Sequence, residues 1–245
     1  MAEFDDQVAV VTGGAQGLGF AISSLLVERG ARVAMLDVDT KALAGSAQSL
    51  GGSNRALAIE TDVTNESAIQ DACKQVHGEF GKVDILVNNA GIYPHATLSE
   101  ISVADWDKVF DVNVKSAFLA MRAFMDGMIE QKYGRMVSIV TVDSYIAKPT
   151  MPHYASSKAA LGNLIKTFAH ELAPHGILVN GVSPGAIATE RAKSQSWLAK
   201  SIKKIPVGHA AEPKDIAEVV LFLASSRNRF VAGETIVASG GAVMI

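Results

Sequence analysis

Cysteine, net charge and long apolar runs are all scarce in this chain. Its 245 residues include one cysteine, Cys73, which excludes an internal disulfide and a cysteine-based zinc site. The formal net charge of -3 gives no electrostatic footprint for nucleic acid or an anionic membrane. No apolar run approaches the ~18 residues of a membrane span, and the acidic start of the chain is unlike a signal peptide. We expect a cytoplasmic protein without nucleic-acid or membrane partners. Histidine spacing indicates no metal site.

Linker composition is also missing. There are only 7 prolines, and no Pro/Ser-rich stretch, charge block or repeat divides the chain, so we expect one domain over residues 1–245. Short apolar runs alternate with helical patterns, which predicts a doubly wound α/β fold with parallel strands covered on both faces. The expected strands are Gln7–Val11, Arg32–Leu36, Ala56–Glu60, Ile85–Val87, Arg135–Val140, Ile177–Val182 and Thr235–Ala238. Helical spacing predicts helices over Val103–Met128 and Ser156–Leu172, and another that begins at Pro213.

The stretch from Gly185 to Gly208 is the least regular part of the sequence. It mixes Trp197 and other apolar side chains with several basic ones. An insertion of this length is either a mobile lid or a solvated excursion of the surface. As a lid over about residues 186–206, it would decide which substrate shapes fit.

A glycine-rich turn follows the first expected strand and opens a helical pattern. Glycines permit a tight turn and a close approach of the backbone to a ligand, and free N–H groups at a helix N-terminus attract a pyrophosphate. A glycine cluster alone is weak evidence, but the strand–turn–helix setting indicates a dinucleotide site. The candidate residues are Gly13, Gln16, Gly17, Leu18 and Gly19.

Asp37 follows the second expected strand. A carboxylate at this place accepts hydrogen bonds from the adenosine ribose hydroxyls and repels a 2′-phosphate. Its neighbours Gln16 and Val38 are uncharged and would not neutralise that phosphate, so NAD is favoured over NADP as the cofactor. The alternative is that Asp37, with Asp39, only caps the next helix.

Tyr154 and Lys158 are four residues apart at the start of a helical pattern and therefore share one face. A lysine ammonium nearby favours the phenolate, as does the positive charge of an oxidised nicotinamide. A fall of the tyrosine pKa by ~2–3 from its usual ~10 would make Tyr154 a general base near neutral pH. The spacing alone also fits a packing tyrosine beside a surface lysine.

Taken in order, the motifs resemble the classical branch of the short-chain dehydrogenase/reductase family over essentially the whole chain. They are Thr12-Gly13 with Gly17 and Gly19, Asp62, Asn88-Asn89-Ala90-Gly91, Asn113, Tyr154 with Lys158, and Ser183-Pro184-Gly185 followed by Thr189. The resemblance implies a single-domain Rossmann-like fold with a seven-stranded parallel sheet flanked by helices. Because the family is commonly tetrameric and the predicted helices have long apolar faces, we expect a homotetramer.

The resemblance also implies roles for individual residues. Tyr154 would be the catalytic base, Lys158 would also hold the nicotinamide ribose, and Asn113 would support a proton relay through water. Thr189 would bind the nicotinamide carboxamide. The further cofactor-binding candidates are Asp62, Val63, Asn89, Ala90, Gly91, Pro184, Gly185 and Ile187.

One position departs from the family pattern. The family usually has a serine where Thr141 stands, and that serine holds the substrate oxygen. A threonine keeps the hydroxyl, but its methyl group restricts the rotamer and narrows the site. Ser138 and Ser144 are possible substitutes, although Ser138 should point to the opposite face of the strand from Thr141. We expect Thr141 to be the catalytic hydroxyl.

A finer resemblance concerns the substrate. The run Asn89-Ala90-Gly91-Ile92-Tyr93-Pro94, with Ser144-Tyr145-Ile146 and His153-Tyr154, is similar to the 1-phenylethanol-type secondary alcohol dehydrogenases. The candidates for the pocket wall are Tyr93, Tyr145, Ile146, Met151 and Trp197, with His95 nearby; each could also be an ordinary loop anchor. Asp143 either lines the pocket mouth or is solvated.

These features predict an NAD-dependent oxidoreductase that interconverts a secondary alcohol and its ketone, with an aryl or apolar substituent as the first expectation. A 3-oxoacyl-thioester or sugar ketone reductase is the alternative within the class, although the expected cofactor site lacks the basic residues that NADPH needs. A non-catalytic NAD-binding regulatory protein is the alternative outside it, and the intact Tyr154–Lys158 pair argues against that.

Overall fold

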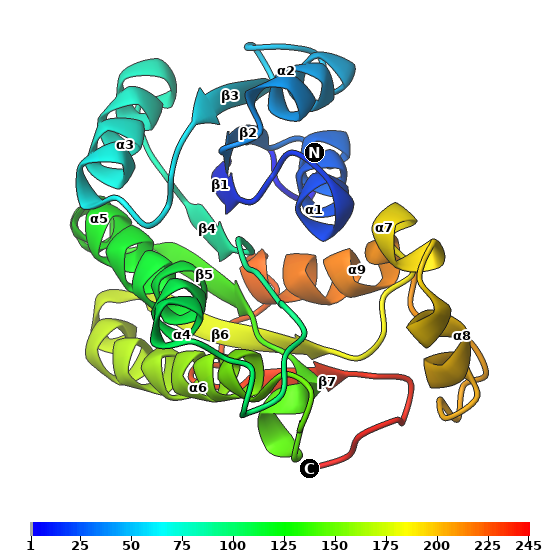
Figure 1. Cartoon of the computed structure of the whole chain (residues 1–245). Helices are drawn as coiled ribbons and strands as arrows, with labels where there is room; N and C mark the ends of the chain where they lie inside the picture. Colours follow the sequence, from blue (N-terminus) through cyan, green and yellow to red (C-terminus); the bar gives the residue numbers. More distant parts are fainter. Residues whose placement is uncertain (1) are drawn as a thin grey trace.

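A computed structural model describes residues 2–245. Within them, seven parallel strands form one sheet, as expected, and their order is β3-β2-β1-β4-β5-β6-β7 (Figure 1). The strands are β1 (Val8–Thr12), β2 (Arg32–Asp37), β3 (Ala56–Glu60), β4 (Ile85–Asn88), β5 (Gly134–Ile139), β6 (Ile177–Pro184) and β7 (Thr235–Ala238). Each lies within one or two residues of its predicted bounds. The apolar runs that mark β1, β2, β4, β5 and β6 are almost wholly buried, whereas β7 is half-buried.

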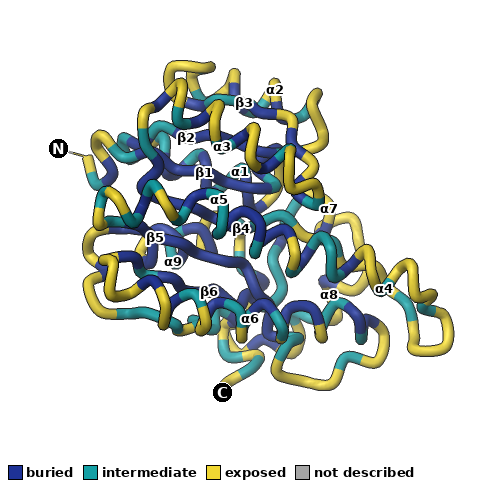
Figure 2. Tube along the Cα trace, turned by 90° about the vertical axis from the view of Figure 1, so that its left-hand side faces the viewer, coloured by how far each residue is buried: buried dark blue, intermediate teal, exposed yellow. Residues whose placement is uncertain are grey.

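Helices cover both faces of this sheet. They are α1 (Gly17–Glu28), α2 (Thr40–Ser49), α3 (Glu66–Phe80), α4 (Val103–Phe110), α5 (Ser116–Gln131), α6 (Pro152–Leu172), α7 (Glu190–Lys193), α8 (Ser196–Ile202) and α9 (Pro213–Ala224). One apolar core joins the sheet to α3, α5 and α6, on the left in Figure 1, and a second joins it to α1, α2 and α9. The central strands β1, β4 and β5 are dark blue, hence buried, in Figure 2. Every helix in this part of the chain is too short or too polar to span a bilayer.

The helix expected over Val103–Met128 is interrupted. A π-helical turn, Asp111–Lys115, separates α4 from α5. A π turn shifts the helix by a residue without a change in residue type, so apolar spacing does not reveal it. Such turns are frequent at functional sites, and this one contains Asn113.

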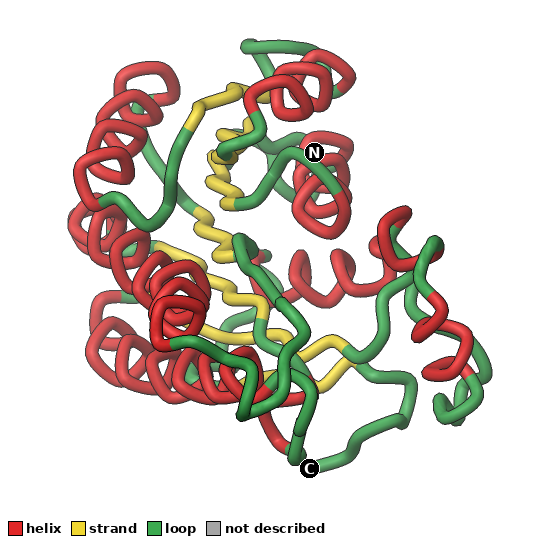
Figure 3. The backbone as a smooth tube through the Cα atoms, viewed as in Figure 1, coloured by secondary structure: helices red, strands yellow, loops and turns green. Residues whose placement is uncertain are grey.

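The stretch expected to be irregular, residues 185–208, contains two short helices, α7 and α8, joined by the loops drawn green in Figure 3. A small apolar cluster accounts for this order: Ala188, Ala192, Leu198 and Ile205 of the stretch are buried together with Ala210, just beyond it. Its start is tied to the segment before α9, because Ala188 N donates to Ala211 O at 2.8 Å.

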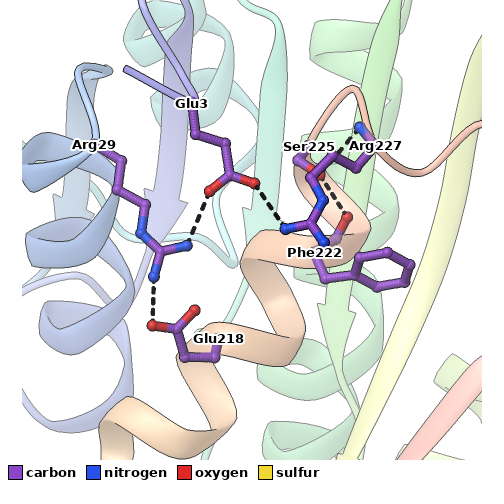
Figure 4. Close-up of polar contacts among 6 residues, drawn as sticks. All are labelled: Glu3, Arg29, Glu218, Phe222, Ser225 and Arg227. Carbon is purple, nitrogen blue, oxygen red and sulfur yellow. Dashed lines mark hydrogen bonds and ion pairs between the residues drawn. The ribbon is translucent and has the colours of Figure 1, made fainter. Parts of the chain in front are cut away.

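A group of charged side chains fastens the start of the chain to the α1 and α9 face (Figure 4). Arg29, which follows α1, pairs with Glu3 at 3.0 Å and also with Glu218 of α9. Arg227, beyond the end of α9, lies 3.7 Å from the other oxygen of Glu3. None of these side chains is a candidate residue of the site.

Candidate active site

The carboxyl ends of the central strands carry most of the candidate residues. The strand order reverses between β1 and β4, and open α/β sheets bind ligands outside the carboxyl ends at such a switch point. The glycine turn follows β1, Asp37 ends β2, Asn89 follows β4 and Thr141 comes soon after β5. Four segments that are far apart in the sequence therefore meet at one edge of the sheet (Figure 1).

The glycine turn is fastened to the end of β4. Asn89 Nδ2 donates to Thr12 O at 3.0 Å and Gly13 O at 2.9 Å, while Thr12 Oγ1 accepts from the N–H groups of Asn89 and Ala90 at 3.0 and 3.1 Å. Gly13 has a φ of 63°, in the left-handed region. A Cβ at Gly19 would lie 2.0 Å from Gly13 O, so only glycine fits there. Asn89 thus has a structural role, which accounts for a polar residue at the end of a buried strand.

Helix α1 begins at this turn with open N–H groups. Its N-cap residue, Gln16, makes no side-chain cap bond within the described chain, and the first turn of α1 has no acidic residue. Thr189 lies across from the turn, because a Cβ at Gly17 would meet its Cγ2 atom at 3.7 Å. The positive end of the α1 dipole, left uncapped beside glycine backbone, fits the pyrophosphate of a dinucleotide.

Asp37 is held by the glycine turn rather than by the helix that follows it. Its Oδ2 atom accepts from Ala15 N at 3.0 Å and its Oδ1 atom from Asp39 N at 3.1 Å. The cap of α2 is Asp39, which accepts from Ala42 N at 3.0 Å. The carboxylate of Asp37 is therefore fixed beside the dinucleotide turn, and the exposed neighbour Val38 brings no positive charge to it.

Asp62 follows β3 and has local partners. Its Oδ1 atom accepts from the N–H of Thr64 at 2.9 Å and from its hydroxyl at 2.7 Å. The hydroxyl bond, then the amide bond, lowers the pKa of Asp62. Val63 beside it is buried.

The end of β6 and the segment after it carry the last group of candidate cofactor residues. β6 ends at Pro184, and a Cβ at Gly185 would lie 3.0 Å from the Cα atom of Ser239, so the backbones are close. Ile187 forms an isolated β-bridge with Ala211. Thr189 then caps α7 by accepting from Ala192 N at 3.2 Å.

Asn113 connects three segments of the site. Its Oδ1 atom accepts from Ile92 N at 2.8 Å, and its Nδ2 atom donates to Ile92 O at 2.9 Å and to Ser157 Oγ at 3.1 Å. Ser157 Oγ in turn donates to Tyr154 O at 2.8 Å. Buried Asn113 therefore holds both the loop after β4 and the first turn of α6 in place.

Lys158 is buried on the inner face of α6. Its Nζ atom donates to Ile139 O at the end of β5 at 2.7 Å. A Cβ at Gly91 would lie 3.2 Å from Asn113 Oδ1 and 3.5 Å from Lys158 Nζ, so these two side chains meet over the Gly91 backbone.

Without a bound nicotinamide, the surroundings of Tyr154 raise its pKa, so the expected fall depends on the charge of the cofactor and stays a prediction. Burial raises the pKa of Tyr154 to about 12, and the negative charge of Asp143 also raises it, whereas a hydrogen bond with the Thr141 side chain lowers it. Burial also shifts the pKa of Lys158, which it lowers to about 8. Desolvation disfavours the charged form of both groups. The four-residue spacing in the sequence does not reveal how deeply the two side chains are buried.

Thr141 is the hydroxyl that reaches Tyr154. It is buried and extended, and its Oγ1 atom also accepts from Asp143 N at 3.3 Å. Of the alternatives, Ser138 is bonded to Asn88 Nδ2 at 3.2 Å inside the sheet, and Ser144 Oγ donates to Thr141 O at 2.6 Å.

A cavity of about 170 Å³ lies between the loop after β4 and the α7–α8 segment, and Tyr93 connects it to Tyr154. The Tyr93 and Tyr154 rings pack edge to face, with 6.1 Å between their centroids. The cavity brings together three predicted substrate residues and four others, since it is lined by Tyr93, Pro94, His95, Arg191, Ala192, Gln195 and Trp197. A larger cavity of about 220 Å³, between β7 and α9, includes none of the catalytic candidates.

The other predicted substrate residues lie outside the smaller cavity. Tyr145, which ends the turn after Thr141, and the next residue, Ile146, are exposed, and Met151 is buried at the start of α6. Asp143 is neither free nor simply solvated, because Lys148 Nζ contacts its Oδ1 atom at 2.9 Å.

Sequence reasoning missed Ser157 and Arg191. No motif marks Ser157, whose role depends on Asn113 of another helix. Arg191 was one of several basic residues in the expected lid, and only its position over the Tyr93 ring, 5.5 Å from the centroid, distinguishes it. Over residues 2–245 the structure has no group of three His, Cys, Asp or Glu side chains placed to hold a metal ion.

Known proteins match nearly the whole chain. Residues 13–243 match the family model described as Enoyl-(Acyl carrier protein) reductase. A solved short-chain type dehydrogenase/reductase from Mycobacterium marinum superposes with a TM-score of 0.93 at 32% identity, over 99% of this chain and 98% of that one. The chain belongs to the short-chain dehydrogenase/reductase family.

Two curated relatives of this family bear on the chemistry. The 3-oxoacyl-(acyl-carrier-protein) reductase FabG of Escherichia coli is 34% identical over 244 residues, 99% of each chain. The BbsD subunit of (2S)-((R)-hydroxy(phenyl)methyl)succinyl-CoA dehydrogenase from Thauera aromatica is 35% identical over 242 residues, 96% of each chain. As a short-chain dehydrogenase/reductase, the protein is an oxidoreductase that uses a nicotinamide cofactor. The finer resemblance to 1-phenylethanol-type enzymes stays a prediction.

Proposed function

We propose that the protein interconverts a secondary alcohol and its ketone with NAD(H), where the ketone is a 3-oxoacyl thioester. The observation that carries the reaction class is the convergence of Tyr154, Thr141 and Lys158 at the carboxyl end of β5, where Tyr154 also meets Tyr93 of the cavity wall. The relatives' names favour the thioester over the free aryl alcohol that the sequence analysis placed first.

Each of the four catalytic candidates has a role in this proposal. Tyr154 takes the hydroxyl proton of the alcohol, and Thr141 orients the oxygen by a hydrogen bond. Lys158, held by Ile139 O, supplies a positive charge that favours the phenolate and a donor for the nicotinamide ribose. Asn113 positions the first turn of α6 and supports the proton relay. The bound nicotinamide supplies hydride acceptance and, when oxidised, a positive charge.

The proposed cofactor is NAD because of Asp37. Its carboxylate is fixed by two backbone N–H groups at the place where the adenosine ribose is expected, and a 2′-phosphate there would meet a negative charge. The remaining proposed cofactor contacts are those given by the sequence, from the α1 N-terminus to Thr189, and the α7–α8 segment is the proposed lid.

The thioester proposal has support in the chemistry of one relative. The substrate in the name of the Thauera aromatica relative is an alcohol that carries a phenyl group on the reacting carbon and is also a CoA thioester. Such a compound joins the aryl substituent and the thioester. The second candidate, a plain aryl secondary alcohol, is favoured by the Tyr93 ring, which packs against Tyr154 at the cavity.

Initial rates with purified protein test the proposal. Acetoacetyl-CoA, benzoylacetyl-CoA and acetophenone are reduced with NADH or NADPH, and both enantiomers of 1-phenylethanol are oxidised with NAD. We expect NADH-dependent reduction of the thioesters. Their kcat/KM should be at least about tenfold above that of acetophenone, which corresponds to about 1.4 kcal/mol of activation free energy. Turnover of acetophenone and 1-phenylethanol alone would support the second candidate. Binding of NADH without turnover of any carbonyl compound would contradict both.

We further propose a homotetramer. Light scattering at micromolar concentration tests it, and a monomeric mass would contradict it.

A further inference from the structure

The cavity lined by Tyr93 has one permanently charged side chain. Tyr93, Pro94 and Trp197 give it apolar walls, and Gln195 and His95 add polar atoms. Arg191 is the only Asp, Glu, Lys or Arg side chain among the residues that line it. A cavity with apolar walls and one guanidinium fits an organic group that carries a negative charge.

The acidic side chains near Arg191 are engaged by its neighbour. Lys193, on the same short helix, contacts Glu190 at 3.0 Å and Glu212 at 3.6 Å. Within the described chain, Arg191 has no carboxylate within ion-pair distance. Its guanidinium, 5.5 Å from the centroid of the Tyr93 ring, is therefore free of a competing carboxylate and can pair with an anionic ligand.

Tyr93 also connects this charge to the reacting centre. Its ring centroid lies 5.5 Å from the guanidinium carbon of Arg191 and 6.1 Å from the centroid of the Tyr154 ring. A substrate whose oxygen lies at the Tyr154 hydroxyl can extend past one aromatic ring and reach the guanidinium.

We propose that Arg191 is a specificity-determining residue that binds an anionic group of the substrate, a carboxylate or a phosphate, in the cavity lined by Tyr93 and Trp197. The inference rests on the proposed function, because it adds a charged group to the same substrate. The anion has two possible sources in a 3-oxoacyl thioester: a carboxylate at the far end of the acyl chain, or the phosphates of the thioester carrier.

Matched substrate pairs distinguish the two sources. 3-Oxoadipyl-N-acetylcysteamine and 3-oxohexanoyl-N-acetylcysteamine differ in the terminal carboxylate, and acetoacetyl-CoA and acetoacetyl-N-acetylcysteamine differ in the carrier phosphates. The measured quantity is the ratio of kcat/KM for the charged and the neutral member. Arg191→Gln should lower one of the two ratios about tenfold, the size of one charge-assisted hydrogen bond. Arg191→Lys should restore part of the lost ratio, because the positive charge remains. The recovery should be incomplete, because lysine lacks the planar guanidinium.

Lys193→Gln is the matched control. It removes a cation from the same helix, but one already paired with Glu190 and Glu212, so both ratios should stay at the wild-type value. A fall of the first ratio in Arg191→Gln assigns the acyl carboxylate, and a fall of the second assigns the carrier phosphate. Unchanged ratios in both pairs, or equal falls in the control, would overturn the proposal.

A binding measurement separates this proposal from the proposed function. Trp197 lines the cavity, so its fluorescence in protein saturated with NAD should respond to 4-acetylbenzoate and to CoA. If no thioester is turned over, the proposed function fails, yet about tenfold weaker binding of one of these probes to Arg191→Gln would still support the anion site. Equal affinity of both proteins for both probes would contradict it.

Discussion

The Nζ atom of Lys158 donates a 2.7 Å hydrogen bond to the carbonyl oxygen of Ile139, the last residue of β5. The bond fixes the ammonium inside the site, four residues beyond Tyr154 on α6. Burial lowers the pKa of this lysine to about 8 and raises that of Tyr154 to about 12. Because the protein without cofactor disfavours ionisation of Tyr154, nearby positive charges must lower the pKa of this tyrosine during catalysis.

Replacement of this lysine tests that conclusion. Lys158→Met removes the charge and the bond to Ile139 O at similar side-chain length. We expect kcat/KM for alcohol oxidation at pH 8 to fall about 10²–10⁴-fold, as for loss of efficient general-base catalysis. Steady-state rates with NAD and the best alcohol give the answer. A loss below tenfold would show that Lys158 does not assist Tyr154.

The hydroxyl at position 141 gives a second prediction. Thr141→Ser keeps a donor and acceptor beside Tyr154 and should retain activity, whereas Thr141→Ala should lose most of kcat. Because Thr141 Oγ1 also accepts from Asp143 N, thermal unfolding of both variants controls for a structural effect. Near-normal kcat in the alanine variant would rule out Thr141 as the oxygen-binding hydroxyl.

The ion pair of Asp143 and Lys148 predicts opposite pH shifts. The negative charge of Asp143 raises the pKa of Tyr154, so Asp143→Asn should lower it and move the rising limb of kcat/KM for alcohol oxidation to lower pH. Lys148 neutralises Asp143 at 2.9 Å, and Lys148→Met should therefore move the limb to higher pH. Each shift should be up to about 1 pH unit, the lower end for a nearby charge.

The two pH profiles are measured with saturating NAD over the stable pH range. Shifts in the same direction, or no shift in either variant, would show that the pair does not influence the base. Lys193→Gln is a control here as well, because its ion pairs are with Glu190 and Glu212.

Part of this site could be predicted from the sequence for a physical reason. Buried parallel strands require apolar runs, and glycine is obligatory where backbones touch, as at Gly19, so both leave a trace in residue type. The π turn at Asn113 and the hydrogen bond from Asn113 to Ser157 leave none, because they depend on how two helices pack. The same holds for Arg191, whose position over Tyr93 follows from the folded α7–α8 segment.

Asp37 predicts the choice of cofactor. Asp37→Asn removes the negative charge but keeps an oxygen that can accept from Ala15 N. We expect the ratio of kcat/KM with NADP to that with NAD to rise at least about tenfold, because a 2′-phosphate no longer meets a carboxylate. Asp39→Asn is the matched control, since Asp39 caps α2 and should not change the ratio. An unchanged ratio in Asp37→Asn would show that another group selects the cofactor.

Two glycines inside helices should respond to alanine in opposite ways. A Cβ at Gly19 of α1 would lie 2.0 Å from Gly13 O and 2.6 Å from Asn89 Nδ2, so the turn must move or the bond from Asn89 must break. Gly45 of α2 has no atom within 4 Å of the Cβ position, and alanine there should stabilise the protein by about 0.5–1 kcal/mol, the helix preference of alanine over glycine.

Thermal unfolding and NADH titration of both variants distinguish packing from binding. We expect Gly19→Ala to be destabilised and to bind NADH at least about tenfold more weakly, one decade or 1.4 kcal/mol, with Gly45→Ala at wild-type affinity. Wild-type affinity in Gly19→Ala would show that the turn does not form the dinucleotide site.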